Sequence, residues 1–450
     1  MSSDTNNLEP NPGSGSDPGD PLETEVLIVG GGMVGLTLAL ALAHAGIRSV
    51  VADLADPAEA VSEDFDGRAM AIAYAPYQML KAIRAWPGLA PFAEAINEIR
   101  VSDGRIGAAA SARSPALQFL HFDHRELGDE PFGFMIETRH IVSQLAAAAR
   151  ERPEITLCVP TQVDGIERSS DGVRATLRAV DGCSEIDGSF NDQVQVSAQL
   201  VVGADGRRSA VRKLAGIGCT VGGYDQTAIV ATVAHARPHG GVAEEYFLPA
   251  GPFAILPLAD LADGTHRSSL VWTETDRRAK TLLGLGDQAF AGHLAERFGD
   301  HLGSHAVTGP RWSYPLGYQQ ADRYVDARLA LAGDAAHGIH PIAGQGLNLG
   351  LRDVAALAEV LVDGYRLGAD LGSPSLLDRY QRWRQFDGLV LLAATDGLNR
   401  LFSNDVLPLR WARDLGLAAV NRAPGLKRFF MRHARGTVGT LPKLLKGEPL

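Results

Sequence analysis

A glycine-rich turn between an apolar strand and an apolar helix constrains the fold of this chain more than any other feature. Residues 26–29 are all apolar, and Gly30, Gly32 and Gly35 follow them in the pattern G-x-G-x-x-G. The first glycine supports a tight turn, the second admits a pyrophosphate, and the third lets helix and strand pack closely. The helix expected over residues 33–45 would present N–H donors to the phosphates. This stretch therefore predicts a dinucleotide-binding unit.

The next predicted strand, residues 49–52, ends on an acid. Asp53 stands eighteen residues after Gly35, which is where a carboxylate that binds a ribose diol is expected. Any glycine-rich turn can match the glycine pattern alone, so the pattern by itself is a weak signal. Strand, helix and acid in register favour dinucleotide binding over a simple turn.

The length and composition of the chain suggest a globular intracellular protein. Its 450 residues are 45% hydrophobic, enough for two or three domains or one large composite core. Residues 1–24 hold five acids and no Lys or Arg, which predicts a disordered tail rather than a signal peptide. No apolar run reaches the ~20 residues needed to cross a bilayer. The three cysteines lack ligand-like spacing, so we expect a reducing compartment and a cytoplasmic location.

Charge is spread unevenly along the chain. The net charge of −11 argues against nucleic acid as a partner. Residues 401–450, in contrast, contain nine Lys or Arg and three Asp or Glu, and residues 426–435 interleave basic and apolar side chains. This segment is either an ordinary surface helix or a contact for an anionic membrane or a partner.

A second apolar strand, residues 328–332, leads into Gly333 and Asp334. A loop with Pro and Gly follows, and then an apolar helix opens near Gly346. Between this strand and the glycine turn, β-like runs predict a separate sheet that covers a cofactor. Three of these expected strands occupy residues 227–236, 254–258 and 268–275.

Four separated motifs together resemble those of the class A flavoprotein aromatic hydroxylases. They are the glycine turn, Asp53, residues 203–209 (GADGRRS) and Gly333-Asp334 with its loop. Residues 340–353 (HPIAGQGLNLGLRD) are similar to the signature of the FAD-dependent hydroxylases of ubiquinone biosynthesis, as are residues 66–71 and 441–449. The resemblance implies an α/β fold with a Rossmann-like, glutathione-reductase-like FAD-binding domain, an inserted β-sheet substrate domain and a helical C-terminus.

The resemblance also divides the chain into segments. After a disordered tail at 1–24, the FAD-binding domain is expected to combine residues 25–100, 131–220 and 325–375. The substrate domain would combine residues 101–130 and 221–324, and residues 376–450 would form the helical C-terminal region.

Residue roles follow from the same resemblance. Gly30, Gly32 and Gly35 would hold the FAD pyrophosphate and Asp53 the adenosine ribose. Family members more often carry Glu at this strand end. Asp is one methylene shorter but is still an acceptor for a diol, so the assignment holds.

Two arginines and two further acids complete the polar part of the implied site. Arg68 and Arg139 match positions near the flavin phosphates and ribityl chain, where a guanidinium can donate two hydrogen bonds. Without the motifs, either arginine would be interpreted as a solvated surface charge. Asp334 resembles the acid that binds the ribityl chain, and Asp205 the acid of the motif shared by FAD and the nicotinamide cofactor. Val163 also belongs to the implied FAD-binding set.

A loop is expected to run past the flavin ring. The helix that begins near Gly346 would point its positive end at the pyrimidine edge and stabilise an anionic reduced flavin. The ring loop contains Pro341, Gly344, Gln345 and Gly346, and the cofactor-binding set continues with Gly333, Leu347 and Asn348.

His337 and His340 stand three residues apart, so a metal pair must be considered. No third ligand has supporting spacing, and the resemblance gives the segment another role, so no metal site is expected. No Ser-His-Asp order or G-x-S-x-G elbow points to a hydrolase.

The function implied is that of an FAD-dependent monooxygenase. It would use NADH or NADPH and O₂ to hydroxylate the ring of a polyprenylated phenol in ubiquinone biosynthesis. Residues 253–258 are either a wall of that site or core. The alternatives are a flavin hydroxylase of a small soluble aromatic compound and a non-catalytic flavin-binding subunit of a biosynthetic complex. A water-insoluble substrate suggests peripheral contact with the inner face of the membrane, within a ubiquinone-biosynthesis complex. The motifs assign neither a catalytic base nor an oligomeric state.

Overall fold

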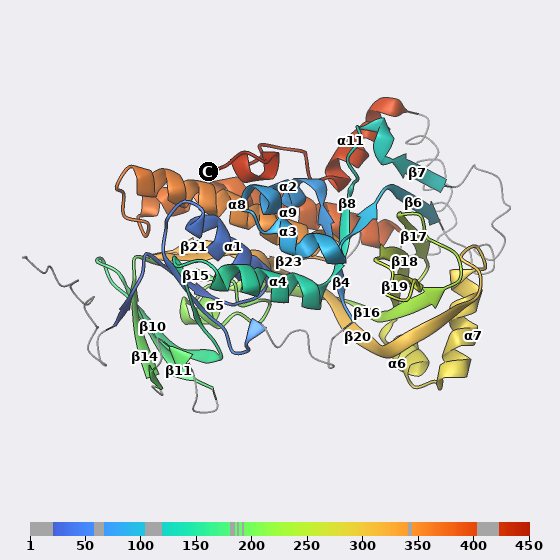
Figure 1. The fold of residues 1–450 in the computed structure, drawn as a ribbon, viewed down its shortest axis with the longest axis horizontal. Helices are drawn as coiled ribbons and strands as arrows, with labels where there is room; N and C mark the ends of the chain where they lie inside the picture. Colours follow the sequence, from blue (N-terminus) through green and yellow to red (C-terminus); the bar gives the residue numbers. More distant parts are fainter. Residues whose placement is uncertain are drawn as a thin grey trace, which may run out of the picture.

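The computed structural model describes residues 21–57, 67–103, 119–180, 185–186, 189–190, 193–340, 344–402 and 423–450. Helices cover a mostly parallel sheet in one half of the molecule, and a large, mostly antiparallel sheet with two helices of its own forms the other half (Figure 1). The predicted α/β class is confirmed.

The parallel sheet is assembled from strands that are far apart in the sequence. Its order is β21-β22-β15-β2-β3-β9, and only β21 runs antiparallel to its neighbour. The strands are β2 (Val26–Val29), β3 (Ser49–Ala52), β9 (Ile155–Cys158), β15 (Leu200–Gly203), β21 (Val325–Asp326) and β22 (Leu329–Leu331). The sequence predicted β2, β3, β15 and β22 at these positions because buried parallel strands are continuous apolar runs.

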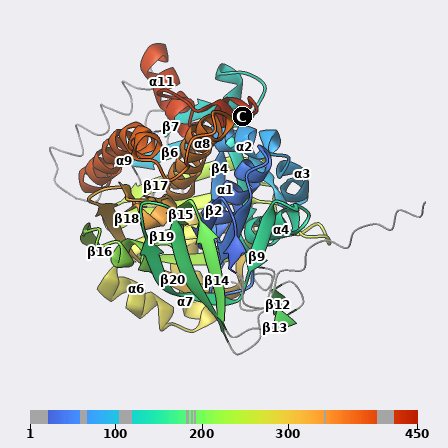
Figure 2. The same cartoon turned by 90° about the vertical axis from the view of Figure 1, so that its left-hand side faces the viewer.

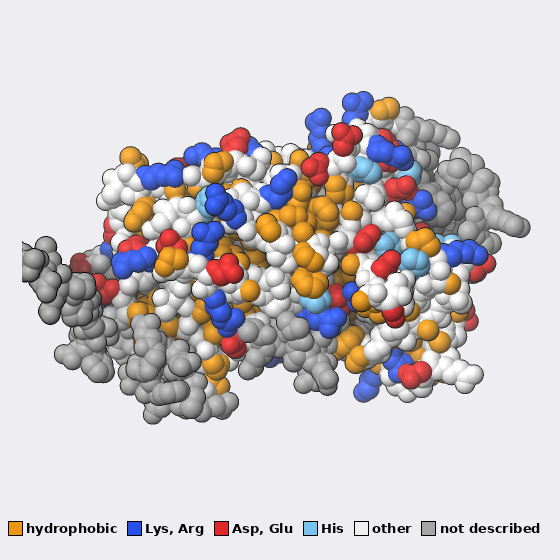
Figure 3. All heavy atoms as spheres, viewed as in Figure 1, with side chains coloured by type: hydrophobic (Ala, Val, Ile, Leu, Met, Phe, Trp, Pro, Cys, Tyr) orange, Lys and Arg blue, Asp and Glu red, His pale blue; other side chains and the backbone are white. Residues whose placement is uncertain are grey.

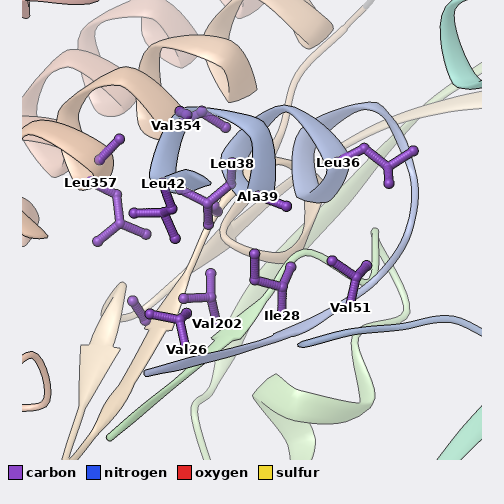
Figure 4. Close-up of a cluster of buried hydrophobic side chains, with 14 of the residues drawn as sticks. Val26, Ile28, Leu36, Leu38, Ala39, Leu42, Val51, Val202, Val354 and Leu357 are labelled. Carbon is purple, nitrogen blue, oxygen red and sulfur yellow. The ribbon is translucent and has the colours of Figure 1, made fainter. Parts of the chain in front are cut away.

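Helix α1 (Met33–Ala43) is buried between this sheet and helix α8 (Gln345–Arg366). Almost every α1 side chain is apolar and buried, as expected for a helix covered on both sides. Figure 4 shows Leu38 and Leu42 of α1 above Val202 of the sheet, with Val354 of α8 on the other side of the helix. Helix α4 (Thr138–Arg150) packs on α1 and β9, and helix α9 (Pro374–Phe402) packs on α8 and β21.

Two smaller sheets flank the parallel one. The first has the order β4-β8-β5 (Ala69–Ala73, Gly133–Glu137, Glu94–Ile96). The second has the order β1-β14-β11-β10 (Leu22–Glu23, Gln193–Ala198, Val173–Ala179, Thr161–Arg168). A short pair, β12 (Glu185–Ile186) and β13 (Ser189–Phe190), stands apart.

The boundary of the predicted tail at residue 24 is wrong. Leu22 and Glu23 pair with Val196 and Ser197 of β14, and Thr24 donates its N–H to Ser197 at 3.0 Å. The acidic composition of the whole stretch hid this short strand. Residues 1–20 lie outside the described part of the chain.

The large sheet has the order β23-β20-β16-β19-β18-β17-β6-β7. Its strands are β6 (Glu98–Asp103), β7 (Phe119–Asp123), β16 (Cys219–His235), β17 (Val242–Leu248), β18 (Gly251–Leu258), β19 (His266–Thr275), β20 (His305–Ala321) and β23 (His337–Gly338). Helices α6 (Asp276–Leu283) and α7 (Asp287–Phe298) enclose a second apolar core against it.

Strands β16, β18 and β19 match the expected ones, whereas β6, β7, β17, β20 and β23 were not predicted. Strand β17 shows why. Its consecutive Glu244 and Glu245 do not resemble a buried strand. Glu244 is nevertheless buried, and its carboxylate lies 3.2 Å from Nε2 of His301. Strand β6 begins at Glu98, inside the segment expected for the FAD-binding domain.

The C-terminal part of the chain contains helix α11 (Pro424–Ala434) and the 3₁₀ turn η6 (Lys443–Lys446). Leu444 and Leu445 of η6 are buried against helix α2 (Tyr74–Ala82) and α8. Helices α8 and α9 lie above the parallel sheet in two perpendicular views, and α11 projects at the top of the molecule (Figure 2). Among the described helices, none is long and apolar enough to cross a membrane.

Candidate cofactor-binding site

The motifs from distant parts of the sequence meet at one edge of the parallel sheet. The N–H of Gly30 donates to the Ala52 carbonyl at 2.8 Å, and the N–H of Ala204 donates to the Val29 carbonyl at 2.7 Å. Ala332 donates likewise to Gly203 at 3.0 Å. The turns after β2, β15 and β22 are therefore adjacent. Ligands of open α/β sheets bind at this carboxyl edge, where the strand order reverses.

The three glycines of the first turn are required for different reasons. Gly30 has φ +114°, and an added Cβ would lie 2.4 Å from the Ala204 carbonyl oxygen. A Cβ at Gly35 would lie 1.9 Å from the Gly30 carbonyl oxygen. At Gly32, in contrast, no atom of the described chain lies within 4 Å of such a Cβ. The fold requires the first and third glycines, whereas the second faces open space that a pyrophosphate could occupy.

The N-terminus of α1 faces the same space. Gly32 is its N-cap, and no side chain of the described residues caps the helix. The first N–H groups of a helix lack intrahelical acceptors and favour anions. This end of α1 therefore fits a phosphate group.

Asp53 lies directly beside the glycine turn, at the end of β3. Its Oδ2 accepts the Gly31 N–H at 2.6 Å and its Oδ1 accepts the Ala55 N–H at 2.9 Å. Each carboxylate oxygen has a further lone pair, so a ribose hydroxyl could still bind. The Asp53 carbonyl also accepts the N–H of Thr161 at 2.6 Å, which brings β10 and its Val163 to the same region.

Asp205 follows β15 at the centre of this edge. Its Oδ2 accepts the N–H groups of Ala210 at 2.6 Å and Val211 at 3.1 Å, and so caps helix α5 (Ala210–Leu214). Its Oδ1 is buried and has no hydrogen-bond partner among the described residues. Leaving such an acceptor unpaired costs about 1–3 kcal/mol. The free lone pairs fit a hydroxyl donor of a bound cofactor.

The turn after β22 presents Asp334. Gly333 has φ +61°, and a Cβ there would lie 2.9 Å from a methyl group of Val34 in α1. The Asp334 side chain is 48% exposed, and its Oδ2 lies 3.4 Å from Nε of Arg207. Asp334 is therefore accessible and held beside the first turn. Arg207 belongs to the 203–209 motif, but the sequence had assigned it no role.

The N-terminus of α8 is a second anion-binding end. Gly344 is the N-cap, and among the described residues no side chain caps it. The N–H groups of Gln345, Gly346 and Leu347 belong to the first helical turn, so they lack intrahelical acceptors. This row of donors is where the sequence predicted the flavin ring to lie. Pro341 of the same loop is outside the described residues.

Asn348 holds this row of donors in place. Its Oδ1 accepts the Ala73 N–H at 2.8 Å, and its Nδ2 donates to the carbonyls of Ala71 at 2.8 Å and Gly344 at 3.0 Å. The amide thus joins α8 to β4, with both of its N–H groups used inside the protein and one lone pair of Oδ1 left over. Asn348 holds the helix in position, and its predicted contact with the cofactor stays a prediction.

Arg68 and Arg139 lie together where β4 and β8 lead into α4. Thr138 donates its N–H to the Arg68 carbonyl at 2.9 Å. The Arg68 guanidinium lies over the Tyr314 ring, 5.4 Å from its centre, and Nη2 of Arg139 lies 3.2 Å from Oε1 of Glu137. Protein groups therefore engage both arginines, and their contact with FAD stays a prediction.

Side chains of residues 253–258 alternate between the two faces of strand β18 in the large sheet, and this alternation decides which of them are core. Phe253 and Ile255 point into the core beneath α7, together with Trp272. Leu256 and Leu258 belong to a separate apolar cluster with Met135 of β8 and Met431 of α11. The first pair is core beneath α7, and the second pair packs towards the small β4-β8-β5 sheet.

The two loop histidines have separate partners. Nε2 of His337 lies 2.6 Å from Oδ2 of Asp353, and the His340 ring meets Tyr224 edge-on at 4.9 Å. Within the described ranges, no group of three or more His, Cys, Asp or Glu is placed to hold a metal.

The sequence missed Asp353 and Arg384 as site residues. Asp353 was noted only as the end of the signature. A signal did exist, since Gly346, Gly350 and Asp353 share one face of helix α8, at spacings of four and three. Arg384 lies thirty-one residues further along, in α9, and nothing local connects it to that face.

Comparisons with known proteins agree with this geometry. Residues 23–387 match the family described as FAD binding domain. The ubiquinone hydroxylase UbiL of Rhodospirillum rubrum is 49% identical, over 95% of this chain and 93% of that protein. The 3-demethoxyubiquinol 3-hydroxylase of Escherichia coli is 35% identical, over 92% and 98% respectively. The crystal structure of p-nitrophenol 4-monooxygenase from Pseudomonas putida superposes with a TM-score of 0.73 at 20% identity, over 93% of this chain and all of that one.

Proposed function

This chain belongs to the FAD-dependent hydroxylases of ubiquinone biosynthesis, and from that premise we propose that it hydroxylates the aromatic ring of a polyprenylated phenol. It uses FAD, O₂ and either NADH or NADPH. The observation that carries the proposal is the meeting of the turns after β2, β15 and β22 beside a buried, unpaired carboxylate oxygen of Asp205. The relatives named above supply the substrate class.

The residues of the carboxyl edge bind and orient the cofactor. When bound and reduced by the nicotinamide, FAD supplies the activated oxygen that the ring receives. The N-terminus of α1 beside Gly32 would hold the pyrophosphate, Asp53 the adenosine ribose and Asp334 the ribityl hydroxyls. The unpaired oxygen of Asp205 would accept a hydroxyl in the motif shared by FAD and the nicotinamide cofactor. The donors at Gln345 and Gly346 stabilise negative charge at the pyrimidine edge.

Quinone analysis of a strain that lacks the protein tests this function. We expect a polyprenylated phenol that lacks one ring hydroxyl to accumulate, and the wild-type protein to restore the quinone. The matched variant is Gly32→Val, whose Cβ meets no described atom of the protein and whose methyl groups should enter the expected pyrophosphate position. It should fold, fail to bind FAD and fail to restore the quinone.

Two other outcomes would replace the proposal. Normal quinone in the deletion strain, with NAD(P)H oxidation driven by a small soluble aromatic compound, would identify a hydroxylase of soluble substrates. Restoration of the quinone by Gly32→Val protein that binds no FAD would identify a non-catalytic subunit.

Helix α11 is the contact through which we expect the protein to reach its lipid-soluble substrate. Leu426, Phe429 and Phe430 lie on one face of the helix and are 43%, 50% and 40% exposed. Arg428 and Arg432 flank them and line a surface hollow of about 630 Å³ together with Phe429. An exposed apolar stripe beside arginines suits an anionic lipid surface. Figure 3 shows basic side chains around this projecting end of the molecule.

Not every basic residue of the segment is available for this contact. Lys427 pairs with Glu126, and the Arg435 guanidinium stacks on the Tyr74 ring at 3.9 Å. The proposal therefore concerns Arg428 and Arg432. It places the protein at the inner face of the membrane, near other enzymes of ubiquinone biosynthesis.

Sedimentation with anionic liposomes tests the membrane contact. We expect Arg428→Glu/Arg432→Glu and Phe429→Ser/Phe430→Ser to reduce the bound fraction. The control is Leu367→Ser. It removes a still more exposed apolar side chain, at the C-terminal end of α8 and outside α11. Equal binding by all of these proteins would remove α11 from the proposal and leave the hydroxylase assignment intact.

A further inference from the structure

A buried carboxylate joins three elements beneath the Gly333–Asp334 turn. Asp353 of α8 is fully buried. Its Oδ2 accepts the Gly333 N–H at 2.9 Å and lies 2.6 Å from Nε2 of His337, while its Oδ1 accepts Nε of Arg384 at 2.8 Å. The turn after β22, strand β23 and helix α9 are therefore all held by one side chain.

The charges around Asp353 determine that its carboxyl group is ionised. Burial alone would raise the pKa of Asp353, but His337 and Arg384 hold that pKa below its ordinary value. Asp353 is therefore a carboxylate that can only accept, so Nε2 of His337 must carry the proton of their shared hydrogen bond. Arg384 is almost fully buried too, and Nη1 lies 2.8 Å from Oδ2 of Asp387.

The same face of α8 packs directly on the turn. A Cβ added at Gly350 would lie 3.2 Å from the Cα of Gly333. The backbone of α8 thus touches the turn at Gly350, and Asp353 bonds to it one helical turn further along. The N-terminus of this helix is the row of donors at Gln345–Leu347, so one rigid element connects the turn to that row.

Buried ion pairs often add little net stability, because desolvation of the charges offsets their attraction. We propose that Asp353, with His337 and Arg384, positions the Gly333–Asp334 turn and the α8 N-terminus against FAD. We call these three residues the α8 clamp. None of them need touch the cofactor, so they are positioning residues. The inference rests on the FAD binding of the proposed function and is independent of the substrate.

The first variant is Asp353→Asn, which keeps the shape but leaves one acceptor oxygen for three donors. We expect the dissociation constant for FAD to rise roughly tenfold or more, because hydrogen bonds to a charged group are the strong ones. We also expect a shift of the flavin visible absorption bands and midpoint potential, since the donors near the ring move. FAD titration of the apoprotein and spectroelectrochemistry measure these quantities.

Two less disruptive variants, both at His337, provide the test if Asp353→Asn fails to fold. His337→Leu removes one donor and leaves Arg384 and Gly333 on the carboxylate. His337→Gln places an amide N–H where Nε2 lies. We expect the Leu variant to bind FAD more weakly with a shifted spectrum, and the Gln variant to recover most of the wild-type behaviour.

The control is Glu274→Gln, which breaks a buried pair with Arg297 at 2.9 Å in the other core. It should lower the melting temperature of the apoprotein without changing FAD affinity. If the clamp variants lose only melting temperature and keep the wild-type FAD affinity and spectrum, the clamp is structural and the inference fails. A wild-type protein that binds no FAD would instead overturn the proposed function.

Discussion

The turns at the carboxyl edge of the parallel sheet depend on residues that lack a side chain, whereas the large sheet depends on big buried ones. At the carboxyl edge, added methyl groups at Gly30 or Gly35 would overlap backbone atoms. In the large sheet, Trp272 packs against Phe253 and Phe290 with ring centres 5.9 and 5.6 Å apart. In the turns of the carboxyl edge, each of these positions accepts only glycine. In the core of the large sheet, only the total volume and the apolar character of the side chains matter, and many sequences meet these conditions.

The largest effect should come from Gly35→Ala. The new Cβ would lie 1.9 Å from the Gly30 carbonyl oxygen, so the turn or the helix must move. We expect a loss of more than about 4 kcal/mol in the free energy of unfolding, among the exceptional values for one substitution. Chemical denaturation of the apoprotein measures it.

Gly32→Ala is the matched variant for that experiment. Its Cβ has no neighbour among the described atoms, so the apoprotein should remain nearly as stable as the wild type while FAD binding weakens. If Gly35→Ala and Gly32→Ala lost the same stability, the distinction would fail: Gly35 would not be required by the fold alone, nor Gly32 by the cofactor alone.

The next largest effect should come from Glu274→Gln in the large sheet. Oε1 of Glu274 lies 2.9 Å from Nη2 of Arg297 and accepts Nε1 of Trp272 at 3.1 Å. Removing the charge leaves a buried guanidinium without its counter-ion, which costs roughly 3–5 kcal/mol. Thermal unfolding should show this loss, and FAD titration should show unchanged affinity. A weaker FAD affinity would mean that the two regions are coupled.

This contrast explains what the sequence could predict. Gly30, Gly35 and Gly333 were identified because a backbone conformation or a close approach at those positions excludes other residues. Strands β2, β3 and β15 were identified because their apolar runs are short and bounded. The family resemblance then connected motifs that propensity alone could not place together.

The missed features depend on long-range contacts. The pairing of β1 with β14 and the burial of Glu244 both rely on partners far away in the sequence. Asp353 and Arg384 form their ion pair only when α8 and α9 pack side by side. No local pattern records such partners, and tertiary contacts routinely override local propensity.

A moderate effect is expected from Asn348→Leu. The substitution removes one acceptor and two donor bonds, and leaves the Ala73 N–H and the carbonyls of Ala71 and Gly344 without this partner. An unpaired buried group costs roughly 1–3 kcal/mol. Both apoprotein stability and FAD affinity should fall, because α8 loses its attachment to β4. Asn348→Asp keeps the acceptor but sets a buried carboxylate oxygen against the carbonyls of Ala71 and Gly344, so it should lose at least as much stability as the Leu variant.

The sharpest test of the junction between the regions concerns Glu137. Burial would raise its pKa, but His140, Arg267 and Arg139 lower the pKa from 4.5 to about 2. Arg267 belongs to β19 of the large sheet, and its Nη2 lies 2.9 Å from Oε2 of Glu137 at the end of β8. The charged carboxylate therefore bonds the large sheet to the small sheet beside the cofactor half.

The sign of the pH dependence follows from that lowered pKa. The folded protein keeps Glu137 charged at pH values where the unfolded chain would bind a proton, so its contribution is complete above pH 4.5. As the pH falls from 4.5 towards about 2, that contribution is lost. In Glu137→Gln apoprotein, stability should fall less over this window than in the wild type, whereas Arg267→Lys should keep most of the wild-type slope. Identical slopes for wild type and Glu137→Gln would mean that this ion pair does not hold the two regions together.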